Sequence, residues 1–221
     1  RAEDIRVGQL LLPRGHSITT SDLMTLANLQ VTHVSVPRLP KVAFTTCGSE
    51  LIDFDGPRAV DNQIADGNRV FLRHALADQL SNVTELPRLT DDRASIEQQV
   101  DRFKNFDLVV TSGGMSVGNF DVLGQVIRSR AEVLVYKIAV KPGKPVLVAK
   151  LDDTIFVGLP GNPVSTLVSF QLFVVPILRL LNGCLSAWPA FSAISLAHPV
   201  DAGGRRLEFK RAMVEIGKKC S

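Results

Sequence analysis

A glycine- and serine-rich stretch at positions 111–118 has the clearest capacity for chemistry in this chain. It reads Thr-Ser-Gly-Gly-Met-Ser-Val-Gly, and it lies between an apolar run and an amphipathic run that begins at Val122. Glycines between a strand and a helix let backbone N–H groups approach an anion, and the helix N-terminus adds favourable partial charge. We therefore predict an anion cradle made of Ser112, Gly113, Gly114, Ser116 and Gly118. A tight turn without a ligand is an equally good interpretation, because a glycine pattern alone is weak evidence.

Positive charge is concentrated in a second stretch. Lys137, Lys141 and Lys144 fall within eight residues, in a segment that Pro142 and Pro145 make rigid. Ammonium groups held in place can bind a phosphate or another oxyanion. Lys137 and Lys141 fall in a predicted strand, where residues an even number apart share one face. A solvated basic turn is the alternative.

A third stretch combines a helix start with a glycine. Asn162 followed by Pro163 is a strong signal for an N-cap and a first helical residue, so a structural cap explains the pair by itself. The first turn of a helix also leaves N–H groups pointing outward, and Gly161 permits close approach. The same residues therefore also predict an anion site.

Four carboxylates accompany these stretches. Glu50 and Asp53 follow the first predicted strand, Asp66 stands at a predicted helix start, and Asp121 follows the glycine-rich stretch. Acidic groups beside an anion cradle repel the anion unless a hard cation bridges them, which favours Mg²⁺ held by oxygen ligands. Asp66 is the one that we expect to act only as a helix cap.

The elements that must position these residues alternate between strands and helices. Strands are expected at 42–46, 83–86, 107–111, 133–138, 146–149 and 155–158, and helices at 63–80, 95–103, 122–130 and 162–181. This alternation predicts an α/β fold with a sheet covered by helices on both faces. Ligands of such folds bind beyond the carboxyl ends of the strands, so the loops after Thr46, Thr111 and Leu159 should share one rim.

Length divides the chain into a domain and two flanks. At about 150 residues per domain, 221 residues hold one α/β domain with flanks left over, and we expect that domain at 41–183. Residues 1–40 form the first flank, which ends at a boundary rich in proline. Residues 184–221 should form part of a β domain, with short strands at 194–197 and 212–216. The apolar stretch at 164–181 is interrupted by polar residues and is expected to be a buried helix.

Composition narrows the function classes. The net charge is only +3 and aromatic residues make up 6%, without the basic stripe that is typical of nucleic-acid binders. The three cysteines and four histidines show no ligand spacing for zinc and no disulfide pattern. We therefore expect a cytoplasmic protein with a small-molecule ligand and without nucleic-acid or membrane partners.

Together the three stretches resemble one family, the MoeA and gephyrin E-domain type molybdopterin molybdotransferases. Residues 112–121 are similar to its S-G-G-x-S-x-G-x-x-D motif, 137–145 to K-x-A-x-K-P-G-K-P, and 159–165 to L-P-G-N-P-V-S. Weaker similarities lie at 46–51, where Cys47 and Ser49 depart from the family pattern, at 66–68, and at 204–211. Family members have four domains, so this chain resembles one without most of the N-terminal domains and the end of the C-terminal one.

The resemblance implies a reaction and a set of roles. The reaction is insertion of molybdate into adenylylated molybdopterin with release of AMP and assistance from Mg²⁺. It implies Glu50, Asp121, Lys137 and Lys141 as catalytic residues, with Glu50 and Asp121 near the metal. It assigns ligand binding to Ser112, Gly113, Gly114, Ser116, Gly118, Lys144, Pro160, Gly161, Asn162, Pro163 and Ser165. It also implies a homodimer whose site is completed by the partner subunit.

Two alternatives stay open. Molybdopterin adenylyltransferases of the MogA type share the domain fold, although the P-G-K-P and L-P-G-N-P segments favour the molybdotransferase branch. A non-catalytic module that binds molybdopterin or serves as a scaffold is the second alternative.

Overall fold

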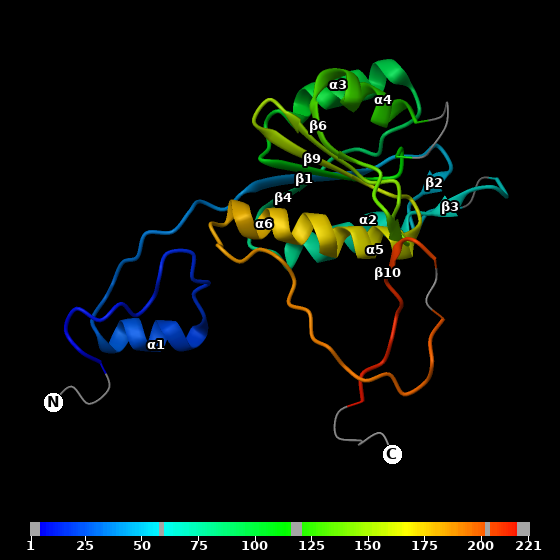
Figure 1. The fold of residues 1–221 in the computed structure, drawn as a ribbon. Helices are drawn as coiled ribbons and strands as arrows, with labels where there is room; N and C mark the ends of the chain where they lie inside the picture. Colours follow the sequence, from blue (N-terminus) through cyan, green and yellow to red (C-terminus); the bar gives the residue numbers. More distant parts are fainter. Residues whose placement is uncertain (1–4, 58–59, 116–120, 202–203, 216–221) are drawn as a thin grey trace.

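A six-stranded sheet forms the centre of the computed structural model, which describes residues 5–57, 60–115, 121–201 and 204–215. The strand order is β4-β1-β5-β9-β8-β6 (Figure 1). These strands are β1 (Lys41–Thr46), β4 (Asn82–Glu85), β5 (Leu108–Ser112), β6 (Glu132–Tyr136), β8 (Leu147–Leu151) and β9 (Thr154–Leu159). β4, β1, β5 and β9 are parallel, whereas β8 and β6 run antiparallel to their neighbours.

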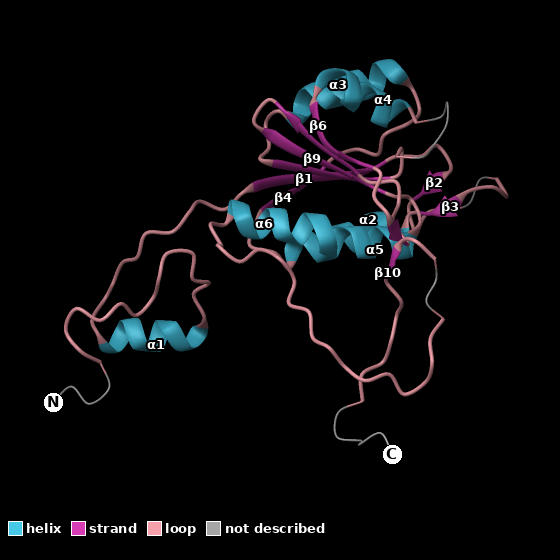
Figure 2. Cartoon of the chain, in the orientation of Figure 1, coloured by secondary structure: helices cyan, strands magenta, loops and turns pink. Residues whose placement is uncertain are grey.

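Helices cover both faces of the sheet, which confirms the predicted three-layer α/β fold (Figure 2). On one face lie α3 (Arg93–Phe103) and α4 (Val122–Arg130), which bury side chains such as Ile96, Val100 and Ile127. On the other lie α2 (Gly67–Ala77) and a long helix at 163–181, which bury Leu72, Phe170 and others. Each such side chain contributes about 1.5–3 kcal/mol on burial, so the two apolar clusters hold the layers together.

Parallel pairing brings the predicted loops to one rim. Thr46 at the end of β1 is in register with Ser112 at the end of β5, and Ser112 is in register with Leu159 at the end of β9. Parallel strands have their carboxyl ends at the same edge, so the three following loops lie side by side. The shared rim predicted from the strand pattern is confirmed.

The long helix has three segments, α5 (Pro163–Ser169), a π-helical turn η1 (Phe170–Val174) and α6 (Val175–Leu181). By length and composition Pro163–Leu181 reaches what a membrane crossing requires, with a mean hydropathy of 1.9 over its most apolar window. Phe170, Val174 and Leu178 are nevertheless buried against the sheet, as in a core helix. The predicted buried helix is therefore found where the sequence placed it.

Two predicted elements are shorter than expected. The helix expected at 63–80 begins at Gly67, because Ile64–Ala65 form a strand, β3, that pairs with β2 (Leu51–Ile52). The strand expected at 133–138 ends at Tyr136, because Lys137 has a φ of 59°. The prediction that Lys137 and Lys141 share one strand face is therefore wrong, since Lys141 belongs to a separate strand, β7 (Val140–Lys141).

The flanking segments carry little regular structure. α1 (Thr20–Asn28) lies apart from the sheet (Figure 1) and buries none of its side chains. The strands expected at 194–197 and 212–216 do not form in the described parts of those ranges, where apolar side chains such as Ile194 and Met213 are exposed. Neither segment pairs with a strand in the described part of the chain. Past Leu181 the described part of the chain has one strand, β10 (Leu207–Glu208), which pairs with β7.

Strand β6 forms one edge of the large sheet. Its pairing with β8 shifts register between Val133 and Val135, and Glu132 stands at its start. At its other end the Tyr136 ring is in contact with two cationic groups, those of Arg128 and Lys137, each 4.6 Å from the ring centroid.

Candidate ligand pocket at the strand ends

A pocket of about 360 Å³, here called the strand-end pocket, opens where β1, β5 and β9 end. Its walls come from the loops after these strands and from the start of α2. The lining residues are Thr46, Cys47, Glu50, Leu51, Asn68, Ser112, Gly113, Gly114, Met115, Pro145, Pro160, Gly161, Asn162 and Ser165. A larger hollow of about 710 Å³ lies between the N-terminal segment and the end of α6, and it contains none of the predicted site residues.

Ser112 belongs to the floor of the strand-end pocket. Its hydroxyl donates a hydrogen bond to Pro160 O at 3.0 Å and accepts one from Asn68 Nδ2 at 2.9 Å. Asn68 Nδ2 also donates to Gly161 O at 2.7 Å. The hydroxyl predicted as a ligand donor therefore joins three loops instead.

The two glycines after β5 are required by close packing on the end of β1. Gly113 has a φ of 87° and Gly114 a φ of 66°, a backbone region that disfavours side chains. A Cβ atom on Gly113 would lie only 2.2 Å from Cys47 O, and Gly113 N–H donates to Leu159 O at 3.1 Å. The Gly113 amide is thus occupied within the protein.

Asn162 caps the long helix as predicted. Its Oδ1 accepts hydrogen bonds from Val164 N at 3.1 Å and Ser165 N at 3.2 Å. Gly161 and Asn162 are exposed on the pocket wall, whereas Pro163 begins the helix outside the pocket lining. The N–H groups expected to meet an anion are satisfied by the cap.

Three carboxylates surround the Cys47 thiol, which is buried at the base of the pocket. Burial raises the pKa of Cys47 to about 12, and the negative charges of Asp91, Glu50 and Asp121 act in the same direction. Glu50 is exposed on the rim, and no described residue forms an ion pair with it. Within the described ranges, no three His, Cys, Asp or Glu side chains are grouped so that they could hold a metal ion.

Asp121 lies outside the pocket lining and is almost fully buried at the start of α4. Its Oδ1 accepts a hydrogen bond from Gly124 N at 3.0 Å, and its Oδ2 pairs with Arg128 Nη1 at 3.3 Å. Burial raises the pKa of Asp121, while the Arg128 and Gly124 hydrogen bonds and the Lys137 charge partly offset this. Both carboxylate oxygens thus have partners within the protein.

The structure does not bring the three predicted lysines into the pocket. Lys137 Nζ lies over the Tyr136 ring, and Lys141 Nζ pairs with Glu208 Oε1 at 3.0 Å. Lys144 is exposed, and its backbone O accepts hydrogen bonds from Ile138 N and Val146 N. The same lysine-rich segment reaches the pocket through Pro145.

The predicted residues thus divide into three groups. Eight line the pocket together, namely Glu50, Ser112, Gly113, Gly114, Pro160, Gly161, Asn162 and Ser165. Asp121, Lys137, Lys141, Lys144 and Pro163 lie outside its lining. Ser116 and Gly118 lie outside the described residues.

Several lining residues were not predicted as site residues, among them Asn68, Thr46 and Met115. Asn68 stands two positions after Asp66, at the start of a helix that follows the first strand. That position, close to the carboxyl ends of the parallel strands, was the available signal.

Comparisons with known proteins agree with this geometry. A family model described as a probable molybdopterin binding domain, MoCF_biosynth, matches residues 43–180. The chain is 37% identical over 221 residues to a protein named molybdopterin molybdenumtransferase from Haemophilus influenzae, covering 98% of this chain and 54% of that protein. It is 31% identical over 212 residues to a protein of the same name from Nostoc sp., covering 93% and 48%.

A solved structure shares the fold. It is described as the molybdopterin biosynthesis moea protein from Pyrococcus horikosii, and it matches with a TM-score of 0.66 and 32% identity over 77% of this chain and 42% of the other. The chain thus spans about half the length of the curated relatives it matches. The family match covers the sheet, the flanking helices and the strand-end pocket, so this chain belongs to the MoCF_biosynth family of probable molybdopterin binding domains.

Proposed function

We propose that this chain acts in molybdenum cofactor biosynthesis, by binding adenylylated molybdopterin and inserting molybdate with release of AMP. One observation carries the proposal: the three stretches singled out in the sequence contribute to a single pocket at the strand ends. Residues 112–115, 160–162 and 165 supply most of its wall, and Pro145 comes from the lysine-rich stretch. Relatives that match 93–98% of the chain bear the name molybdopterin molybdenumtransferase, which supports this reaction.

The walls of the strand-end pocket would fix the ligand by shape and by backbone contacts. Gly161 and Asn162 are exposed on one side, and Glu50 is exposed on another. Cleavage of a phosphoanhydride depends mainly on positioning and on neutralising charge. The Lys137 and Lys141 side chains have partners within the protein, whereas the exposed Lys144 side chain has none among the described residues. We therefore propose that Lys144 contributes positive charge near the ligand.

Glu50 fits Mg²⁺ better than Asp121 does. Magnesium in phosphate sites is commonly held by one or two carboxylates together with substrate oxygens and water. Glu50 is an exposed oxygen donor on the pocket rim, whereas both oxygens of Asp121 already have partners. We therefore propose that Glu50 holds the metal, that Asp121 orders the start of α4, and that Mg²⁺ neutralises phosphate charge when bound.

Two further expectations from the sequence are part of this proposal. The first is that the protein works as a homodimer, with the partner subunit completing the site. The second is a cytoplasmic location. Sedimentation of the chain with and without ligand tests the first, because a dimer would double its mass.

Release of AMP from adenylylated molybdopterin in the presence of molybdate and Mg²⁺ tests the reaction. Glu50→Gln is expected to lower the rate by at least about a hundredfold, since it removes a charged metal ligand. Glu97→Gln is the matched control, because the Glu97 carboxylate pairs with Arg93 on α3 and is not part of the pocket lining. Equal rates for Glu50→Gln and the unchanged chain would contradict the assignment.

The same assay separates the two alternatives. ATP-dependent adenylylation of molybdopterin, in place of AMP release, would identify an adenylyltransferase. Calorimetric binding of adenylylated molybdopterin without any AMP release would identify a binding module.

A further inference from the structure

Glu50 is attached to a strand that has too little pairing of its own to hold it. β2 consists of Leu51 and Ile52 alone, and isolated short ribbons are marginal in water. Its backbone is bonded to β3 through Ile64 N to Glu50 O at 2.9 Å and Asp66 N to Ile52 O at 2.8 Å. Carbonyl groups alternate along a strand, so Leu51 O faces the opposite edge, where no strand of the described residues pairs with β2.

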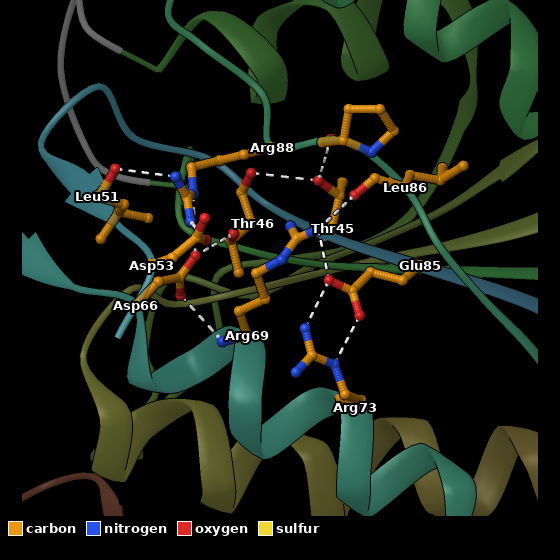
Figure 3. Close-up of polar contacts among 11 residues, drawn as sticks. Thr45, Thr46, Leu51, Asp53, Asp66, Arg69, Arg73, Glu85, Leu86 and Arg88 are labelled. Atoms are coloured by element: carbon orange, nitrogen blue, oxygen red, sulfur yellow. Dashed lines mark hydrogen bonds and ion pairs between the residues drawn. The ribbon is translucent and has the colours of Figure 1, made fainter. Parts of the chain in front are cut away.

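Arg88 supplies the missing contact on that edge (Figure 3). Its Nη1 donates to Leu51 O at 3.0 Å, and its Nη2 pairs with Asp53 Oδ1 at 2.6 Å. Its Nε pairs with Asp66 Oδ2 at 3.2 Å. One guanidinium therefore contacts β2, the residue after it, and the residue that precedes α2.

Asp66 carries this connection to the pocket. Its side chain is 1% exposed, and Oδ2 accepts a hydrogen bond from Thr46 Oγ1 while Oδ1 caps α2 by accepting from Arg69 N at 2.9 Å. The prediction that Asp66 acts only as a cap was therefore incomplete. A carboxylate this deeply buried needs a cationic partner, and Arg88 provides it.

The residues held in this way form one wall of the strand-end pocket. Thr46, Glu50 and Leu51 line it, and so does Asn68 in the first turn of α2. Arg88 itself is absent from the lining and has 23% of its side chain exposed. It therefore makes no direct contact with a ligand in the pocket, and we expect it to act mainly through the residues that it positions.

We propose that Arg88 is a positioning residue that fixes the Glu50 carboxylate for its ligand, a role that rests on the function proposed above. Lysine cannot replace it, because one ammonium group does not present three donors in a planar fork to three separate partners. Displacement of a binding group by a fraction of an ångström weakens its contribution even when the fold survives.

Arg88→Gln tests this, with Arg73→Gln as the matched control. Arg73 also donates two hydrogen bonds to a carboxylate, that of Glu85 (Figure 3), and neither residue belongs to the pocket lining. Amide hydrogen exchange is expected to become about tenfold faster at Ile64 and Asp66, the donors to β2, in Arg88→Gln and not in Arg73→Gln. Unchanged exchange at both amides would overturn the proposal without any reference to a ligand.

Calorimetry with adenylylated molybdopterin and Mg²⁺ provides the functional readout. Arg88→Gln is expected to weaken binding about tenfold, with little restoration by Arg88→Lys, while Arg73→Gln leaves the affinity unchanged. In a Glu50→Gln background Arg88→Gln should have almost no additional effect, because its action passes through Glu50. Two results would show that Arg88 has only a structural role. One is faster amide exchange with unchanged ligand affinity, and the other is full additivity of the Glu50→Gln and Arg88→Gln effects on affinity.

The two proposals fail in different ways. If the unchanged chain does not bind the ligand, the proposed function is wrong, and amide exchange still decides whether Arg88 holds β2. If the unchanged chain binds the ligand while Arg88→Gln shows the same amide exchange and the same affinity as Arg73→Gln, the positioning role is wrong and the proposed function stands.

Discussion

Asp121 combines two roles that burial makes costly. It caps α4 and pairs with Arg128, yet its carboxylate is removed from water, and the net result is a raised pKa. The unfolded chain has no such burial, so its Asp121 ionises near 3.8, before the native one does. Between these two pKa values the native state binds more protons, and stability falls as the pH rises.

Asp121→Asn should reveal this effect, because asparagine also caps helices but does not titrate. The free energy of unfolding of the variant minus that of the unchanged chain is expected to increase from pH 3.8 upward, until native Asp121 is ionised. Urea denaturation at a series of pH values measures it.

Asp152→Asn is the control for this prediction. The hydrogen bond from Lys104 lowers the pKa of Asp152, so the ion pair stabilises the native state only as the pH rises toward 3.8. The same difference should therefore decrease with pH for this variant. A pH-independent difference for Asp121→Asn would contradict the prediction.

Residue types at the site were predictable, but their hydrogen-bond partners were not. Ser112, Gly113 and Asn162 were placed at the site by pattern, and all three line the pocket. The pattern predicted the Asn162 cap, but it gave no indication that the Ser112 hydroxyl bonds to Pro160 O or that Asn68 donates to Ser112. Donors in a turn serve either a ligand or the protein, and only the three-dimensional partners distinguish the two.

At the scale of elements, the turn after β5 depends on Gly113. Gly113→Ala would place a Cβ 2.2 Å from Cys47 O at a φ of 87°. We expect a loss of more than about 2 kcal/mol of unfolding free energy, because the left-handed region alone costs about 1–2 kcal/mol and the backbone contact adds to it.

Gly161→Ala is the matched control from the facing loop. Its Cβ would meet nothing closer than Gly113 Cα at 3.7 Å, and Gly161 does not have a positive φ. Chemical denaturation should show it to be within about 0.5 kcal/mol of the unchanged chain. Similar losses for both variants would show that the turn does not have the geometry described.

Elements with strong local patterns were predicted, and elements that depend on tertiary partners were not. β5 begins with the apolar run Leu108-Val-Val, whose β-branched valines favour a buried strand, and α3 buries Ile96, Val100 and Phe103 at helical spacing. β3 is two residues long and exists because β2 lies beside it, so the sequence was interpreted as helix there. β6 ends before Lys137 because that residue has a φ of 59°, and a positive φ is uncommon in a residue other than glycine, so the sequence did not predict it.

At the scale of the whole molecule, the chain has a packed body and open flanks. We propose residues 41–183 as the independently stable domain, since both buried apolar clusters lie entirely within that range. Residues 186–201 form no helix or strand, and Arg205 and Arg206 are exposed.

Brief digestion with trypsin tests this boundary. Cleavage is expected first after Arg14, Arg205 or Arg206, while Arg102 and Arg128 within helices of the body stay intact. Mass spectrometry of the surviving fragment identifies its ends. Early cleavage after Arg102 or Arg128 would show that the body is less stable than its flanks.

The flanks were also where the sequence predicted least well. Apolar side chains such as Ile194 and Met213 suggested strands, yet they are exposed in the structure. A strand requires a neighbour for its backbone groups, and the pattern of one segment does not say whether a neighbour exists.

The irregular edge strand β6 has a consequence for solubility. An open edge with exposed apolar residues such as Leu134 is a template on which strands of other molecules can pair and build aggregates. The register shift between Val133 and Val135 interrupts the regular row of backbone donors and acceptors, and Glu132 adds a charge at the start of the strand. The two cations that contact Tyr136 would have to lose water before a second chain could approach. The edge that completes the sheet is therefore also the one that keeps neighbouring molecules from extending it.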